Sequence, residues 1–393
     1  MFGKPGHLLH ISRVWGSQHG GSFYSRALVD EMLKKGWKVT LFADQFGDGE
    51  EFCERVRLAA FFRRAISSWL GKAVEILKIW KLVSHTPQAL VIVQGDLPRI
   101  TYLFLQLWVP LIFIRQDGIL TCPGNNRFLR RSRSVCRKPF GLSCLWMQRE
   151  ENCFGRLSLL RQVGRLAFRF RDSLLLRAFP NFIANSNYVA QVHNKPHRVL
   201  YPPRSSGSEC TIAALRNLRR LVFCGRLEEV KGAEDAIRTL ALLPKEFHLE
   251  MLGEGLDRGR LGELVADLKL GARVRFHGWV APKTRDKWLA SAGVLLLPSL
   301  WDEAFGMAGI EALAQGTPVV AYDVGGVSEW CRDGAGVLVG CGDIRRAAAA
   351  VDQLTADPVR WAVHSRAARD LVDLEFPPER FVIELDAVLL RGS

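Results

Sequence analysis

The chain has 393 residues, of which 54 are Lys or Arg and 40 are Asp or Glu, so its formal net charge is +14. This length favours two domains over one, and a hydrophobic content of 48% is enough for substantial cores. We expect no signal peptide, no membrane span and no disulfide scaffold. The most apolar window, 100–114, is too short for a span and is interrupted by Gln106 and Pro110. Nine scattered cysteines suit a reducing compartment.

The first half opens with a strand–helix–strand pattern. We expect strands at 7–11 and 37–42 and a helix at 22–35, with Gly20 and Gly21 in the turn before the helix. Glycines at such a turn let the backbone approach a ligand closely, often a phosphate. The pattern differs from the G-x-G-x-x-G sequence of dinucleotide sites, so a nicotinamide cofactor is not favoured.

Basic residues gather in the first half. Residues 55–85 are expected to be helical and mix aromatic with basic side chains, and residues 127–171 contain twelve Lys or Arg against two acidic residues. The helix at 55–85 either packs on a sheet in the ordinary way or lies on an anionic membrane. The charge of 127–171 either forms an ordinary solvated face or meets an anionic surface such as a membrane. The side chains proposed for membrane docking are Arg130, Arg131, Arg133, Arg137 and Lys138.

Further buried strands are expected at 89–93 and 111–114. Gln116 and Asp117 follow the second of these, at the strand end where ligands bind in doubly wound sheets. Four cysteines come next, and they lack the C-x-x-C pairs of zinc modules, so we expect free thiols and no metal. They are Cys122, Cys136, Cys144 and Cys153.

A change in composition marks the domain boundary. The stretch 202–208 is rich in Pro, Ser and Gly and is typical of a linker. We therefore predict an N-terminal acceptor-binding domain at 1–203, a linker at 204–218 and a C-terminal domain at 219–375. The last segment, 376–393, is expected to return to the N-terminal domain.

The C-terminal domain begins with a strand at 221–224, followed by a turn and a helix at 233–243. Arg226 and Lys231 lie in this turn. If both point inward, they can clamp a diphosphate, the first as a fork and the second as a point charge. Alternatively, they are two solvated surface cations.

After further strands at 248–252 and 274–280, a strand at 293–298 leads into an acidic loop and then a helix that ends at Gly316. Glu303 lies in the loop and Glu311 in the helix. A helix N-terminus attracts anions, and carboxylates accept hydrogen bonds from hydroxyl groups. The loop and helix therefore predict a site for a molecule that carries both phosphate and sugar.

Strands and helices alternate through both halves, which predicts parallel sheets with helices on both faces. Ligand-facing turns of such a sheet share one edge, so the glycine-bearing turns should converge there.

The second half resembles the retaining glycosyltransferases of family 4, which have the GT-B fold. The matching motifs are Gly225-Arg226-Leu227 through Lys231-Gly232, Gly253-Glu254-Gly255, Phe276 to Val280, Pro298-Ser299, Glu303 to Glu311, and Gly325-Gly326. The first half resembles the acceptor domain of this family more loosely, through Gly20-Gly21 and Ala184-Asn185-Ser186. The resemblance implies an α/β fold of two Rossmann-like doubly wound domains that face a central cleft.

The resemblance also assigns roles within a nucleotide-sugar site. Arg226 and Lys231 would neutralise the leaving diphosphate, Glu303 would bind donor-sugar hydroxyls, and Glu311 would bind the ribose. Gly20 and Gly21 would approach the phosphates from the first domain. The remaining donor-site residues are Gly225, Gly253, Trp279, Val280 and the backbone amides around Phe305, Gly306 and Met307.

The function implied is metal-independent, retaining sugar transfer from a UDP- or GDP-sugar to a glycan or lipid-linked acceptor. The basic, aromatic first half suits a lipid-linked acceptor of bacterial polysaccharide or lipopolysaccharide synthesis, in the cytoplasm or on the inner membrane face. Many relatives carry His-Asp where this chain has Gln116-Asp117, and we expect Asp117 near the acceptor. The alternatives are transfer to a soluble acceptor and a catalytically impaired, sugar-nucleotide-binding partner of another transferase.

Overall fold

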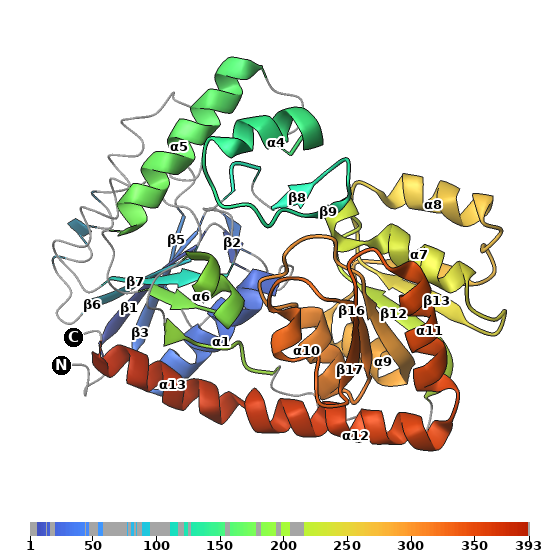
Figure 1. Cartoon of the computed structure of the whole chain (residues 1–393). Coiled ribbons are helices and arrows are strands. Elements are labelled where there is room, and N and C mark those ends of the chain that lie inside the picture. Colours follow the sequence, from blue (N-terminus) through green and yellow to red (C-terminus); the bar gives the residue numbers. More distant parts are fainter. Residues whose placement is uncertain are drawn as a thin grey trace. The chain divides into compact units, whose positions relative to one another are not determined.

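The computed structural model shows two compact α/β units (Figure 1). The first unit comprises residues 1–116, 170–203 and 379–393, and the second comprises 117–169 and 204–378. The residues that the structure describes are 6–12, 14–15, 20–43, 45–46, 54–57, 77, 80–81, 84, 89–94, 111–116, 122–124, 127–153, 158–177, 182–193, 198–204 and 216–391.

The first unit is built on a seven-stranded sheet in the order β11-β10-β7-β6-β1-β3-β5, with parallel pairing throughout. Its strands are β1 (His7–Ser12), β3 (Lys38–Ala43), β5 (Glu54–Arg57), β6 (Ala89–Gln94), β7 (Leu111–Arg115), β10 (Phe182–Ala184) and β11 (Arg198–Val199). Two further short strands, β2 (Val14–Trp15) and β4 (Gln45–Phe46), pair with each other. The sheet order changes direction between β1 and β6, as in a doubly wound sheet.

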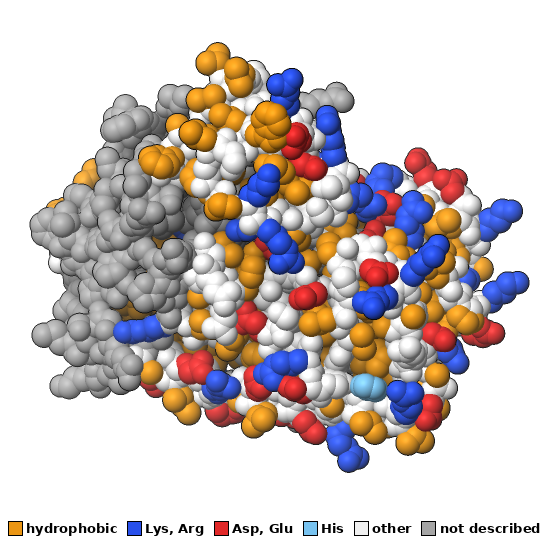
Figure 2. Space-filling model, viewed as in Figure 1, with side chains coloured by type: hydrophobic (Ala, Val, Ile, Leu, Met, Phe, Trp, Pro, Cys, Tyr) orange, Lys and Arg blue, Asp and Glu red, His pale blue; other side chains and the backbone are white. Residues whose placement is uncertain are grey.

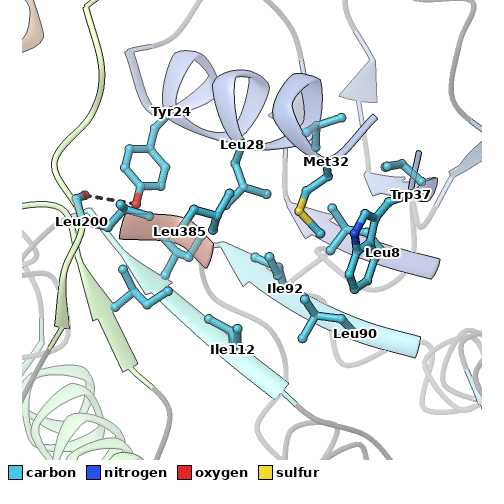
Figure 3. Packing of buried hydrophobic residues seen from close by; sticks show 14 of the residues in the cluster. Leu8, Tyr24, Leu28, Met32, Trp37, Leu90, Ile92, Ile112, Leu200 and Leu385 are labelled. Atoms are coloured by element: carbon cyan, nitrogen blue, oxygen red, sulfur yellow. Dashed lines mark hydrogen bonds between the residues drawn. The ribbon is translucent and has the colours of Figure 1, made fainter. Parts of the chain in front are cut away.

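Helix α1 (Gly20–Lys34) covers this sheet through one apolar face (Figure 3). Leu28 and Met32, one helical turn apart, are fully buried against sheet residues such as Leu8 and Ile92. The Tyr24 hydroxyl donates a hydrogen bond of 3.1 Å to the Leu200 carbonyl, which satisfies the polar end of this buried ring.

The C-terminal helix α13 (Pro378–Arg391) packs on the same core. Phe381 and Leu385 are buried in it, and the Phe381 ring meets Tyr24 edge-on with centroids 5.7 Å apart. Lys35 forms an ion pair with Asp386 of α13. The last segment of the chain is thus part of the first unit.

The second unit is built on a six-stranded parallel sheet in the order β14-β13-β12-β15-β16-β17. Its strands are β12 (Asn217–Cys224), β13 (His248–Leu252), β14 (Val274–Gly278), β15 (Ala292–Leu297), β16 (Val319–Tyr322) and β17 (Gly336–Val339). The helical elements are η4 (Glu229–Lys231), α7 (Ala233–Ala241), α8 (Arg258–Asp267), α9 (Pro282–Ser291), α10 (Met307–Ala314), η5 (Gly325–Glu329), α11 (Ile344–Thr355) and α12 (Pro358–Glu375). Helix α7 packs with α8 and α11, whereas α10 packs with α9 and α12. The sheet order reverses between β12 and β15.

Residues 117–169 group with the second unit, although they lie in the range 1–203 expected for the first domain. Their described elements are the hairpin strands β8 (Phe128–Leu129) and β9 (Ser134–Val135), helix α4 (Ser143–Glu151) and the start of α5 (Leu159–Arg177). Long-range ion pairs explain the grouping, since Arg127 contacts Asp302 and Arg133 contacts Asp235. Helix α6 (Asn187–His193) belongs to the first unit.

Two local expectations differ from the structure. Gly20 and Gly21 lie in the first turn of α1 rather than in a preceding loop. The helix expected from Arg55 is wrong at its start, because Glu54–Arg57 forms edge strand β5; most of its remainder lies outside the described residues. The expected linker lies mainly outside the described residues, and β12 begins at Asn217.

None of the described helices is long and apolar enough to cross a membrane.

We expect Phe381→Ala to lower the free energy of unfolding of the first unit by about 3 kcal/mol, because it leaves a cavity in the core. Ile383→Ala is the matched control, since this side chain of α13 is 69% exposed. Urea unfolding monitored by circular dichroism measures both changes. Equal effects of the two substitutions would contradict the packing of α13 described here.

Candidate functional site

The second unit has a candidate site where its sheet order reverses. Strands β12 and β15 are neighbours there, and the loops after them leave the sheet at the same edge. The Leu300 amide donates a hydrogen bond of 2.9 Å to the Val230 carbonyl, which joins these loops. Gly232 makes the close approach possible, since a Cβ there would lie 1.7 Å from the Pro298 carbonyl oxygen and φ is +70°. Reversal points of this kind are the usual ligand sites of doubly wound sheets.

Lys231 and Glu303 meet at this point as an ion pair. The Lys231 Nζ atom lies 2.6 Å from Glu303 Oε1, and the Ser299 hydroxyl donates to the same oxygen at 2.7 Å. Burial alone would raise the pKa of the Glu303 carboxyl, but the ammonium and the hydroxyl stabilise the charged form and the net shift is downward. Glu303 is therefore an ionised hydrogen-bond acceptor.

Arg226 differs from Lys231 in its environment. Its side chain is 58% exposed and its Nη1 donates to Glu228 Oε1 at 2.7 Å. Lys231 is 20% exposed, and its Nζ lies 4.8 Å from the centroid of the Trp301 ring. The two cations of the predicted clamp thus differ, since Lys231 is largely buried and Arg226 is exposed.

Glu311 lies in helix α10 and pairs with Arg285 of α9. The Arg285 Nη1 atom is 2.7 Å from Glu311 Oε1, and Asp286 accepts hydrogen bonds from the same guanidinium. Burial raises the pKa of the Glu311 carboxyl to about 7, with a smaller contribution from the Asp286 charge, although Arg285 acts in the opposite direction. Glu311 therefore changes its protonation state near neutral pH.

Helix α10 begins directly after the acidic loop. Gly306 is its N-cap residue with φ 84°, Met307 is its first residue, and Phe305 is buried with its carbonyl accepting a hydrogen bond from Trp330. Gly326 donates its amide to the Glu303 carbonyl at 2.7 Å, which fixes the loop backbone. The amides at the start of α10 are thus held next to the loop that carries Glu303.

The remaining predicted residues of this unit follow the strands β12, β13 and β14. The Gly225 amide bonds to the Leu252 carbonyl and the Gly253 amide to the Gly278 carbonyl, at 3.0 and 2.8 Å. Trp279 is 49% exposed and Val280 is half-buried. They lie at the same sheet edge as the ion pair.

The other predicted residues are Gly20, Gly21 and Gln116 of the first unit, and Asp117. Gly20 and Gly21 begin α1, and Asp117 lies outside the described residues. Gln116 directly follows β7, and its amide nitrogen is buried without a hydrogen-bond partner within the described residues. Gly20 and Gly21 stay predicted donor-phosphate groups, and Asp117 stays a predicted acceptor-side group.

Several contacts of the site were not predicted from the sequence. Arg285 pairs with Glu311, and Arg127 and Arg133 pair with acidic residues beside Glu303 and Lys231. Each pair joins residues far apart in the chain, so no local spacing indicates it. We no longer propose Arg133 for membrane docking, because its guanidinium pairs with carboxylates of this chain.

The described cysteines are free thiols. Burial raises the pKa of the Cys122 and Cys144 thiols, and it raises that of Cys153 to about 12. Within the described residues there is no group of three or more His, Cys, Asp or Glu side chains arranged to hold a metal ion.

Comparison with known proteins shows what the second unit resembles. Residues 214–370 match the family model for glycosyl transferases group 1. This stretch of the chain contains the Lys231–Glu303 and Arg285–Glu311 pairs. The lipopolysaccharide core biosynthesis glycosyltransferase LpsE of Rhizobium meliloti is 40% identical over 134 residues, which are 34% of this chain and 38% of that protein. The 2-deoxystreptamine glucosyltransferase of Streptomyces kanamyceticus is 30% identical over 39% of this chain and 41% of its own. The chain thus spans less than half the length of these curated relatives.

Solved structures show the fold of the whole chain. Anabaena HepE in complex with UDP and glucose matches with a TM-score of 0.69 and 18% identity, covering 98% of this chain and all of that one. WaaG, a glycosyltransferase involved in lipopolysaccharide biosynthesis, matches with a TM-score of 0.70 and 14% identity, covering 98% of this chain and 99% of its own. The expected GT-B fold, with two doubly wound α/β units, is confirmed.

We expect Lys231→Met to lower the free energy of unfolding of the second unit by about 3 kcal/mol, because it removes the partner of a buried carboxylate. Arg226→Met is the matched control, and its exposed pair with Glu228 should contribute less than about 1 kcal/mol. Chemical denaturation of both variants measures the difference. The buried ion pair would be contradicted if the two variants were equally stable.

Proposed function

We propose that the protein is a retaining glycosyltransferase that takes a sugar from a nucleoside-diphosphate sugar. The observation that carries this proposal is the Lys231–Glu303 pair at the reversal point of the second sheet, within the segment that matches group 1 glycosyl transferases. One partner is a cation suited to a diphosphate, and the other is an ionised acceptor suited to sugar hydroxyls.

In the proposed reaction, the bond between the anomeric carbon and the distal phosphate oxygen breaks. The oxygen of an acceptor hydroxyl bonds to that carbon on the same face, and its proton passes to the departing phosphate. The nucleoside diphosphate leaves with the negative charge. Lys231 and Arg226 stabilise this charge as it develops, which lowers the barrier to transfer.

These cations supply the positive charge that a divalent metal supplies in other transferases, so we propose metal-independent transfer. Glu303 holds the donor sugar and Glu311 the ribose, with the amides of Gly306 and Met307 adding hydrogen-bond donors. Activity that persists in EDTA supports this proposal, and activity restored only by Mg²⁺ or Mn²⁺ contradicts it.

For the acceptor, we propose a glycan or lipid-linked molecule of bacterial polysaccharide or lipopolysaccharide synthesis. Support comes from one relative, since LpsE is a glycosyltransferase of lipopolysaccharide core biosynthesis. We place Asp117 near the acceptor. Gln116 at the end of β7 is neither a base nor a cation, so the proposed proton transfer to phosphate avoids this residue.

The direct test incubates the full chain with UDP-glucose, UDP-galactose, UDP-N-acetylglucosamine and GDP-mannose, each radiolabelled in the sugar, and a bacterial lipid extract. Label in the lipid fraction supports the proposal. Lys231→Ala should reduce transfer by more than about 100-fold, since it removes charge stabilisation of the leaving group. Label in water-soluble glycans instead would indicate a soluble acceptor. Tight binding of a donor without transfer to any acceptor would indicate a sugar-nucleotide-binding partner.

Donor binding should weaken in mildly acidic solution. Because the pKa of Glu311 is about 7, its ionised fraction falls about tenfold between pH 8 and pH 6. Only the ionised carboxylate accepts hydrogen bonds from both ribose hydroxyls, so the Kd for the bound nucleotide sugar should rise about tenfold over this range. Isothermal titration calorimetry with the intact nucleotide sugar measures it.

Glu311→Gln provides the control, because glutamine does not titrate. It should bind the donor more weakly at pH 8 and show a nearly flat pH dependence. An unchanged affinity at pH 8, or an unchanged slope, would contradict the assignment of Glu311 to the ribose.

We further propose that the enzyme works on the inner face of the cytoplasmic membrane, attached through α4 and α5. Leu142, Trp146, Leu159, Leu160 and Val163 are large apolar side chains that are 47–87% exposed. Figure 2 shows hydrophobic side chains gathered over these helices, with Lys and Arg beside them. An apolar helix face next to basic residues suits an anionic bilayer.

Replacing Leu159 and Leu160 together with serine should weaken binding to phosphatidylcholine vesicles containing phosphatidylglycerol by at least about tenfold. Neutralising Arg130, Arg131, Arg137 and Lys138 should also weaken vesicle binding. This reduction should be larger at low salt, because salt screens the attraction to the anionic lipid. Leu256→Ser is the matched control, since Leu256 is 97% exposed elsewhere in the second unit. Co-sedimentation measures binding, and unchanged binding of the double serine variant would contradict the proposal.

A further inference from the structure

The hairpin formed by β8 and β9 carries an arginine before each of its strands. Arg127 precedes β8 and Arg133 precedes β9, and both have left-handed backbones with φ of 50° and 48°. This conformation is uncommon for residues other than glycine, so other contacts must maintain it. Both guanidinium groups make such contacts, and both contacts lead to the candidate donor site.

Arg127 connects the hairpin to the acidic loop after β15. Its Nε lies 3.2 Å from Asp302 Oδ2, and its Nε and Nη2 also donate to the Cys136 carbonyl at 3.1 and 2.9 Å. The two ionised side chains are only 18% and 11% exposed. Since Asp302 directly precedes Glu303, this pair fixes the backbone that presents the sugar-binding carboxylate.

Arg133 connects the other end of the hairpin to the turn after β12. Its Nη1 and Nη2 lie 3.4 and 3.2 Å from Glu234 Oε1 and Asp235 Oδ1, and its Nε lies 3.9 Å from Glu229 Oε1. Asp235 is deeply buried and also accepts a hydrogen bond from Tyr322 at 2.9 Å. These acidic residues stand on both sides of Lys231 in the chain.

The contacts form a closed ring. It runs from the hairpin through Arg127 and Asp302 to Glu303, across the ion pair to Lys231, and through the acidic turn and Arg133 back to the hairpin. Each arginine also neutralises carboxylates that would otherwise repel a diphosphate.

We propose that Arg127 and Arg133 are positioning residues for the donor, holding the loops of Glu303 and Lys231 at the separation that the nucleotide sugar requires. This inference rests on the proposed function, because it assigns these arginines to the same donor site. They act through Asp302 and through the acidic turn, not through contact with the donor. The hairpin therefore belongs functionally to the second unit, although it precedes that unit in the chain.

The test measures the Kd of the full chain for the nucleotide sugar that binds best in the panel above. Arg127→Met and Arg133→Met should each raise it at least tenfold, through loop displacement and unpaired negative charge. Arg131→Met is the control, an exposed arginine of the same hairpin, and should change it less than twofold. Binding is measured well below the unfolding temperature of each variant.

A rescue experiment separates positioning from a role in stability alone. Arg127→Gln together with Asp302→Asn removes both charges but keeps an amide donor where Arg127 Nε lies and an acceptor oxygen on residue 302. The hairpin and the loop can then stay joined by an uncharged hydrogen bond, so the Kd should return to within about threefold of the wild-type value. Arg133→Lys should recover only part of the lost affinity, because an ammonium cannot contact several carboxylates as a guanidinium does. If a Met variant fails to fold, this double variant and Arg133→Lys supply the measurement.

The inference is overturned if the Met variants lower the unfolding temperature but keep the Kd within twofold of the wild-type value. It is also overturned if the double variant binds the nucleotide sugar as weakly as Arg127→Met. If the wild-type protein binds no nucleotide sugar of the panel, the proposed function fails first, and this inference fails with it.

Discussion

The ion pair between Lys231 and Glu303 is the interaction on which the second unit depends. A buried carboxylate is costly unless charged and polar partners surround it, and here the partners come from two loops that follow adjacent strands. The loops can meet only because Gly232 lets the backbone reach Pro298 and Gly325 lets the next loop reach Glu303. The recurrent glycines of this half thus serve the approach of backbones around one charge pair.

The fold and the position of the site were predictable from local patterns. Alternating strands and helices predict a parallel sheet, and parallel strands end at one edge, so Lys231 and Glu303 could be expected to lie near each other. The glycines after β12 and β15 indicated close backbone approach at the same edge. Strand order was not predicted, yet it explains why these two loops meet, because the order reverses between β12 and β15.

The partners of the charged residues could not be predicted in this way. Arg285 is 26 positions from Glu311, and Arg133 is about 100 positions from its carboxylates, so only the tertiary structure brings them together. The arginine-rich segment shows the consequence. Its net charge suggested an anionic surface outside the protein, but Arg127 and Arg133 neutralise carboxylates of the same chain. Charge counting along a segment does not distinguish external from internal partners.

The two cations proposed to bind the diphosphate, Lys231 and Arg226, are not equivalent. Lys231 cannot leave Glu303 without stranding a buried carboxylate, so it must meet an incoming phosphate while still paired. Arg226 shares an exposed pair with Glu228, and such pairs contribute little to stability, so Arg226 can exchange that partner for a phosphate at small cost. A clamp with one fixed and one exchangeable cation can hold the sugar end of the donor in place while the charge at the diphosphate end changes during transfer.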